Sequence, residues 1–162
     1  MKRDINAVIK IGGSIFLNCR ESIKPLFKTI ADMGRLFRLV IVPGGGPFAD
    51  EVLKRSKEFE LSDSTAHWMA ILAMNQMAFM ISEFLEGSRV VLDVSDARRV
   101  TKGHRVPIIA PFRLLFNRDP LPHSWNVTSD SIAAYIAKSM RARLLILLKD
   151  VDGIYTDDPK KV

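Results

Sequence analysis

The first motif of the chain is Ala7-Val8-Ile9-Lys10-Ile11-Gly12-Gly13-Ser14, an apolar run that ends in two glycines and a hydroxyl residue. Two later segments have the same design: Pro43-Gly44-Gly45-Gly46 follows an apolar run at 39–42, and Asp150-Val151-Asp152-Gly153-Ile154-Tyr155 follows one at 144–148. Glycine lacks a β-carbon, so its backbone N–H groups can approach an anion closely. The three segments therefore predict strand ends that hold phosphate.

Composition limits the class of protein. The 162 residues are 48% apolar and 26% charged, which suits one globular domain with a substantial core. Lysine and arginine number 24 against 18 for aspartate and glutamate, and the net charge of +6 suits an anionic ligand. The basic residues are spread along the chain and are not clustered among aromatic residues, so we expect no nucleic-acid partner.

The expected compartment is the cytoplasm. The single cysteine, Cys19, fits a reducing environment and is given no other role. The N-terminal residues show no signal-peptide cleavage pattern. Residues 66–85 have the length of a membrane span, but they contain His67, Asn75 and Glu83, which are costly in lipid. We therefore expect a buried helix there and no membrane partner.

Strand and helix signals alternate along the chain. Strands are predicted at residues 7–11, 39–42, 89–92, 106–109 and 144–148. Helices are predicted at residues 22–33, 47–57, 62–86 and 128–140, the last beginning with the capping cluster Ser129-Asp130-Ser131. This order predicts βαβ units and a mostly parallel sheet, in which the wholly apolar 144–148 is a central strand.

The helix predicted at 62–86 carries Met69, Met74, Met77 and Met80 and has apolar residues on more than one face. Methionines at this density could form an adaptable binding face, but core or subunit packing is the commoner role of such a stripe. We therefore expect a homo-oligomer, a homodimer or larger.

The glycine motifs also have simpler explanations. Gly12-Gly13 alone could be a tight turn between a strand and a helix. Three successive glycines, Gly44-Gly45-Gly46, are better explained by close approach of a ligand, because each costs about 0.5–1 kcal/mol of backbone entropy relative to alanine. The sequence contains neither a G-x-x-x-x-G-K-[ST] loop nor a G-x-G-x-x-G fingerprint, so a different fold would hold the phosphate.

Four motifs in this order resemble the amino acid kinase superfamily. They are Val8-Ile9-Lys10-Ile11-Gly12-Gly13-Ser14, Val42-Pro43-Gly44-Gly45-Gly46, Thr128-Ser129-Asp130-Ser131 and Asp150-Val151-Asp152-Gly153-Ile154-Tyr155. The resemblance covers essentially the whole chain. It implies a three-layer αβα sandwich with a mostly parallel central sheet, ATP and Mg²⁺ as cofactors, and phosphoryl transfer to a small anionic substrate.

The resemblance also implies a role for each matched residue. Lys10 would bridge the ATP phosphates and Asp130 would orient Lys10, which makes these two the candidate catalytic residues; taken alone, they could be a strand-end lysine and a helix N-cap. The residues implied around the nucleotide are Gly12, Gly13, Ser14, Lys149, Asp150, Asp152, Gly153 and Tyr155. Those implied around the acceptor are Gly44, Gly45, Gly46 and Ser129. No residue is assigned to a metal.

Within the superfamily, His123-Ser124-Trp125 before Thr128 is most similar to small archaeal-type kinases of methanofuran biosynthesis. These convert an aminomethylfuran methyl phosphate to its diphosphate. The alternatives are a carboxylate or uridylate kinase, or a member of the fold that binds nucleotide or oxyanion without turnover. His67 and His123 are expected to be structural because no second ligand at metal spacing accompanies them. Trp125 is expected to pack.

Two features depart from the family pattern. Lys149 stands where many relatives have threonine, which would add a cation near the phosphates. The chain is also shorter than its relatives. We expect a single domain over 1–162, in which about 1–122 binds the acceptor and dimerises. The remainder, about 123–162, would begin the nucleotide-binding part, whose C-terminal portion is cut short.

Overall fold

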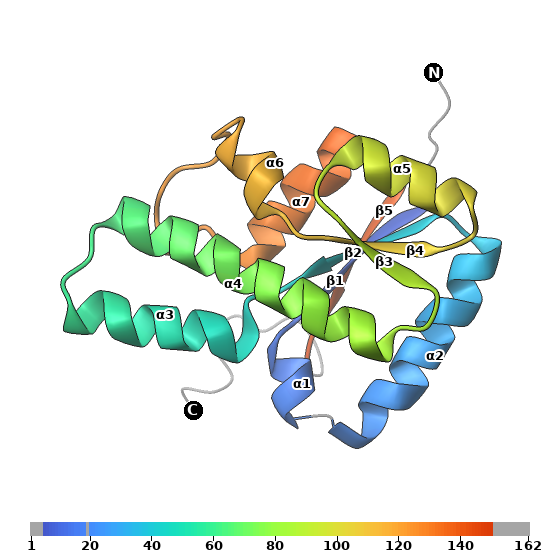
Figure 1. Ribbon diagram of the computed structural model, residues 1–162, viewed down its shortest axis with the longest axis horizontal. Coiled ribbons are helices and arrows are strands. Elements are labelled where there is room, and N and C mark those ends of the chain that lie inside the picture. Colours follow the sequence, from blue (N-terminus) through green and yellow to red (C-terminus); the bar gives the residue numbers. More distant parts are fainter. Residues whose placement is uncertain (1–4, 19, 151–162) are drawn as a thin grey trace, which may run out of the picture.

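A computed structural model describes residues 5–18 and 20–150 (Figure 1). Within these ranges, five strands form one sheet in the order β3-β4-β2-β1-β5, and every neighbouring pair is parallel. The strands are β1 (Ala7–Ile11), β2 (Leu39–Pro43), β3 (Ser88–Val91), β4 (Val106–Ile109) and β5 (Leu144–Leu148). All five predicted strands are confirmed, with ends that shift by a residue at most.

The helices connect the strands in chain order. They are α1 (Ser14–Asn18), α2 (Arg20–Leu36), α3 (Gly46–Glu58), α4 (Asp63–Phe84), α5 (Val94–Lys102), α6 (Phe112–Phe116) and α7 (Ser129–Met140). Four of them, α2, α3, α4 and α7, confirm the predicted helices. The sequence analysis missed α5, a mostly polar helix that begins where the Asp93 carboxylate accepts a hydrogen bond from the Asp96 N–H at 2.8 Å.

Helices cover both faces of the sheet, and this confirms the three-layer αβα sandwich (Figure 1). Side chains alternate along a strand, so Ile9 of β1 packs toward α1 and α2 while Val8 packs toward α5 and α7. The long helix α4 contributes to both layers, with Met74 on the α7 side and Met77 on the α2 side. The predicted buried helix thus buries its inner face in two cores.

The position of β5 corrects one prediction. Its Leu-Leu-Ile-Leu-Leu run predicted a central strand, but in the described part of the chain β5 lies at the edge of the sheet, beside β1. Leu144 is 61% exposed and Leu147 is 40% exposed. An apolar run of this kind is typical of a strand that is buried on both faces. Composition does not specify which strands become its neighbours in the sheet.

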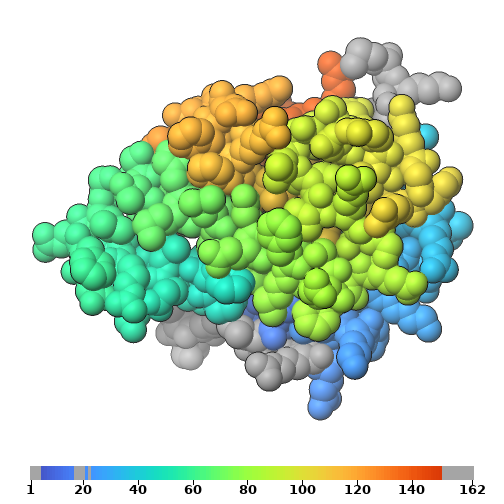
Figure 2. Space-filling model, viewed as in Figure 1, coloured from blue at the N-terminus to red at the C-terminus, as the bar shows by residue number. Residues whose placement is uncertain are grey.

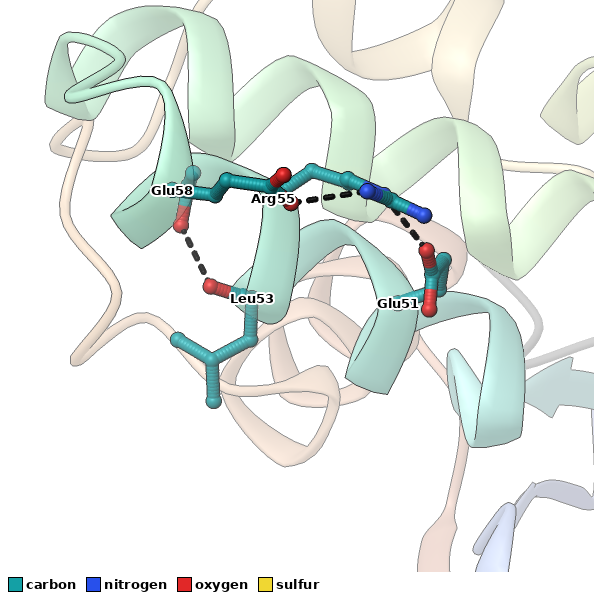
Figure 3. Close-up of polar contacts among 5 residues, drawn as sticks. Glu51, Leu53, Arg55 and Glu58 are labelled. Carbon is teal, nitrogen blue, oxygen red and sulfur yellow. Dashed lines mark hydrogen bonds and ion pairs between the residues drawn. The ribbon is translucent and has the colours of Figure 1, made fainter.

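A helical hairpin of α3 and α4 projects beyond the sheet (Figure 1). On the outer face of α3, Arg55 lies between Glu51 and Glu58, with nitrogen–oxygen distances of 2.7 Å to each (Figure 3). Exposed ion pairs of this kind contribute about 0–1 kcal/mol, so they do not hold the hairpin together. The inner faces of α3 and α4 pack on each other and form one wall of the site described below.

The packing of α2 on the sheet can be tested by replacing a buried side chain. Phe27 is 1% exposed and packs against Phe16 and Phe84, so Phe27→Ala should lower the free energy of unfolding by about 3–5 kcal/mol. Phe37, 47% exposed, is the matched control, and its replacement by alanine should cost much less. Urea unfolding followed by circular dichroism measures both. Equal losses would contradict this packing.

Candidate active site

The candidate site lies where β1, β2 and β5 end. Because the three strands are parallel and in register, with Ile11 opposite both Pro43 and Leu148, the segments that follow them meet at one edge of the sheet. The chain passes from β1 to β2 on one side and returns to place β5 on the other. This reversal of strand order is where open α/β sheets generally bind ligands.

The two glycine loops touch each other through their backbones. A β-carbon on Gly13 would lie 2.1 Å from Cα of Gly46, so no side chain can be accommodated between the loops. Gly46 also has a φ of +54°, which favours glycine. The structure therefore brings together the two loops that the sequence analysis assigned to the nucleotide and the acceptor.

Two of the loop amides are used within the protein. The Gly12 N–H donates to the Leu148 carbonyl at 3.2 Å, and the Gly44 N–H donates to the Ile11 carbonyl at 2.8 Å. These bonds extend the strand pairing into the loops. They leave Gly13, Gly45 and Gly46 as the better candidates for N–H groups that contact phosphate.

Lys10 is directed into the site by strand geometry. It alternates with Ile9 and Ile11, so it lies on the α7 face of the sheet, and it is only 6% exposed. Its Nζ lies 2.9 Å from Oδ1 of Asp130 in α7. A buried lysine of this kind needs an anionic partner, and Asp130 supplies it.

Lys149, directly after β5, reaches the same carboxylate. Its Nζ donates to Oδ2 of Asp130 at 2.5 Å. Partial burial alone would raise the pKa of Asp130, but the contacts with Lys149 and Lys10 outweigh burial and hold that pKa below its ordinary value. One carboxylate thus bridges two ammonium groups, and the cluster keeps a net positive charge at neutral pH.

Asp130 does not cap its helix, contrary to the capping cluster expected there. The residue at the N-cap of α7 is Thr128, whose side chain makes no capping hydrogen bond. The Asp130 carboxylate instead turns to the two lysines, and its buried Oδ1 receives no well-aligned hydrogen bond among the described residues. The ion pairs with β1 and β5 thus take the place of the local cap.

Of the remaining predicted site residues, some have contacts in the structure and others lie outside the described residues. Ser14 donates a hydrogen bond to Oδ1 of Asp150 at 2.8 Å, which ties the β1 loop to the end of β5. Ser129 lies beside Gly44, because a β-carbon added to Gly44 would lie 3.4 Å from the Oγ of Ser129. Asp152, Gly153 and Tyr155 lie outside the described residues.

A cavity of about 200 Å³ adjoins the triple glycine, and the sequence analysis did not predict it. It is lined by Gly45 and Ser129 at one end, by apolar side chains of α3, α4 and α7, and by His67 and Trp125. Both aromatic residues were expected to be structural. The signal that could have found them was the closeness of His123-Ser124-Trp125 to the motif that begins at Thr128.

Comparison with known proteins agrees with this geometry. Residues 7–162 match the model of the amino acid kinase family. The chain is 32% identical to the [5-(aminomethyl)furan-3-yl]methyl phosphate kinase of Methanocaldococcus jannaschii, over 94% of this chain and 69% of that protein. It is 28% identical to the uridylate kinase of Archaeoglobus fulgidus, over 96% of this chain and 67% of that protein.

Solved structures give the same picture. The crystal structure of uridylate kinase from Archaeoglobus fulgidus superposes with a TM-score of 0.72 at 25% identity, covering 96% of this chain and 68% of that one. The UMP kinase of Ureaplasma parvum has the same fold, with a TM-score of 0.70 at 20% identity over 98% of this chain and 72% of that one. The relatives named here are kinases, and this chain shares their fold. The chain belongs to the amino acid kinase family.

No helix in the ranges 5–18 and 20–150 combines the length and the apolar character needed to cross a bilayer.

The backbone contact between the loops can be tested by adding one methyl group. Gly13→Ala should destabilise the protein by about 1–3 kcal/mol, because its β-carbon collides with the backbone of Gly46. Gly103→Ala is the matched control, since its nearest contact would be the Val100 carbonyl oxygen at an ordinary 3.5 Å. Thermal unfolding compares them, and an unchanged midpoint for the Gly13 variant would disprove the contact.

Proposed function

We propose that this chain catalyses ATP-dependent phosphoryl transfer to a small phosphate monoester and yields a diphosphate. The observation that supports this most directly is the cluster in which Asp130 holds Lys10 and Lys149 beside two glycine loops. Phosphoryl transfer depends on positioning and on positive charge around the transferring group, with little covalent help from the protein. This cluster and the loop amides would supply both.

The proposed reaction is an in-line displacement. An oxygen of the acceptor phosphate forms a bond to the γ-phosphorus of ATP as the bond from that phosphorus to the β,γ-bridging oxygen breaks, and ADP leaves with the electron pair. A phosphate monoester has a second pKa of about 6 and is ionised at neutral pH, so no base is needed to remove a proton. For this reason we assign no residue the role of a general base.

The residues divide between the two substrates. We assign Lys10 and Asp130 to the transferring phosphoryl group. Gly12, Gly13, Ser14, Lys149 and Asp150 are assigned to the nucleotide side, with Asp152, Gly153 and Tyr155 expected beside it. The acceptor phosphate is assigned to Gly44, Gly45, Gly46 and Ser129, where the cavity begins.

Mg²⁺ fits this arrangement as a companion of the nucleotide. No group of three potential metal-ligating side chains occurs in the described part of the chain, and Asp130 is already engaged by two lysines. Mg²⁺ commonly binds through substrate phosphates and one or two carboxylates. When bound together with ATP, Mg²⁺ would neutralise negative charge that develops during transfer.

The acceptor class follows from what the named relatives share. One relative is named for an aminomethylfuran methyl phosphate and others for uridylate, and both compounds are phosphate monoesters. We propose the aminomethylfuran methyl phosphate type as the first acceptor to test and UMP as the second. A carboxylate acceptor and binding without turnover are the remaining outcomes.

Replacing Lys10 tests catalysis directly. Lys10→Met keeps the length of the side chain and removes its charge, so kcat for ADP formation should fall by about 10²–10³-fold, as expected for loss of a group that stabilises the transferring phosphoryl. A coupled ADP assay with [5-(aminomethyl)furan-3-yl]methyl phosphate, UMP and glutamate as acceptors measures this.

Lys138 provides the control, because it is exposed near the C-terminal end of α7, and Lys138→Met should leave kcat unchanged. Turnover of glutamate alone would overturn the phosphate acceptor. Binding of ATP by the wild type without ADP from any acceptor would identify a non-catalytic member of the family.

We further propose that the protein forms a homo-oligomer through the outer face of α4. Leu72 and Phe79 are 41% and 60% exposed and are spaced to share this face. In Figure 2 the outer face of α4, in green, lies uncovered on the molecular surface. The neighbouring Phe116 of α6, 55% exposed, extends the apolar surface. An exposed apolar patch of this kind commonly marks an interface.

A charge on this face should disrupt the oligomer. Phe79→Glu should shift the mass in sedimentation velocity toward the 18.2 kDa monomer, because a buried unpaired carboxylate is unfavourable at an apolar contact. Phe59→Glu is the control, since Phe59 is 64% exposed but lies at the end of α3. A wild type that sediments as a monomer would refute the interface.

Two further assignments belong to the same proposal. We place the reaction in the cytoplasm, where ATP and a reducing environment suit the single cysteine. We also keep the division at about residue 122. In this division 1–122 mainly binds the acceptor and mediates oligomer contacts, and 123–162 begins the nucleotide part. Some residues of the second part, among them Ser124 and Ser129, also line the cavity proposed for the acceptor.

A further inference from the structure

The cavity beside Gly45 contains an imidazole that the proposed reaction does not use. Its walls are formed largely by Ala70, Ile71, Met74 and Ile132, and His67 is the single ionisable side chain among the described residues that line it. A phosphate held at Gly45 and Ser129 would direct the organic part of the acceptor between these walls. His67 would then face that organic part and not the phosphoryl group.

The buried position of His67 favours its neutral form. It is 4% exposed, and together with Ser124 it lines the cavity. Burial lowers the pKa of His67, the nearby His123 lowers it further, and Asp119 and the Ser124 backbone only partly oppose them. A neutral imidazole has one N–H and one nitrogen lone pair, and the lone pair accepts a hydrogen bond.

His123 fixes the loop that closes the cavity. Its ring stacks on His67, with centroids 4.8 Å apart and planes 20° apart. Its Nδ1 lies 2.8 Å from the Ser64 hydroxyl, at the start of α4, and its Nε2 lies 2.7 Å from the Asp119 carboxylate. Both ring nitrogens are therefore engaged, and the segment carrying Ser124 is anchored to α4. His123 is a positioning residue for the cavity.

We propose that His67 determines acceptor specificity by accepting a hydrogen bond from an N–H or O–H group on the organic part of a compact phosphate monoester. This inference rests on the proposed function, because it places the acceptor in the cavity beside Gly45. An acceptor that lacks such a donor would leave a buried imidazole nitrogen unpaired among apolar walls. Sites built this way reject such analogues strongly.

Matched acceptors and matched variants test the hydrogen bond. The acceptor probes are [5-(aminomethyl)furan-3-yl]methyl phosphate and the analogue with methyl in place of aminomethyl, or UMP and its 2′,3′-dideoxy form. In the wild type, the probe without the donor should have a KM about tenfold higher or more. In His67→Phe this ratio should fall to near one, while the KM for ATP stays unchanged. His67→Gln, which keeps an acceptor, should retain most of the ratio.

The outcomes separate this inference from the proposed function. A ratio that persists in His67→Phe, or a KM for ATP that rises in parallel, overturns the role of His67. If the wild type makes no ADP, the proposed function fails, and isothermal titration of the same probe pairs still tests the hydrogen bond. Equal binding of the two members of each pair by the wild type, or no binding of either pair, overturns it without requiring any variant to fold.

His123 has its own test as a positioning residue. His123→Ala should raise the KM for the acceptor severalfold, with kcat and the KM for ATP unchanged, because the loop loses its attachment to Ser64. His123→Gln should restore part of the affinity by bonding Ser64 again. A loss confined to thermal stability, with unaltered KM values, would show that the stack has no part in acceptor binding.

Discussion

The bridge from Asp130 to Lys10 and Lys149 joins the separate parts of this site. It links the N-terminal turn of α7 to the ends of β1 and β5, and the lysine ammonium groups lie 2.9 Å and 2.5 Å from its two oxygens. A single buried lysine would be unfavourable, and two lysines side by side would repel each other. The shared carboxylate makes it possible to hold both cations next to a site for phosphate.

The sheet positions this bridge. β1 lies between β2 and β5, so the chain segments leaving all three strands emerge at one edge. Gly13 and Gly46 then meet without side chains, which brings the loops after β1 and β2 into direct backbone contact. The amides of Gly12 and Gly44 are used by bonds that extend the strand pairing, so they are not available to a ligand. The remaining loop amides are the ones available to a ligand.

The cavity that we propose for the acceptor is built differently. Apolar walls from α3, α4 and α7 surround a cavity in which polarity comes from backbone, hydroxyl groups and one imidazole. The stack of His67 on His123 holds that imidazole in place. Charged groups are thus concentrated at the ends of β1 and β5. The cavity beside them offers apolar walls and the imidazole of His67. In the proposed reaction the first region serves transfer and the second serves selection.

Much of this protein could be predicted from local sequence. The apolar runs and their glycine ends predicted the strands and the loops, because strand formation and close backbone approach depend on neighbouring residues. Alternation along β1 likewise places Lys10 opposite Ile9 and Ile11. Only the tertiary structure decided that β5 lies at the edge of the described sheet, that Lys149 shares Asp130 across 19 positions, and that His67 meets His123. These contacts join residues distant in the chain, and their formation depends on how whole layers pack.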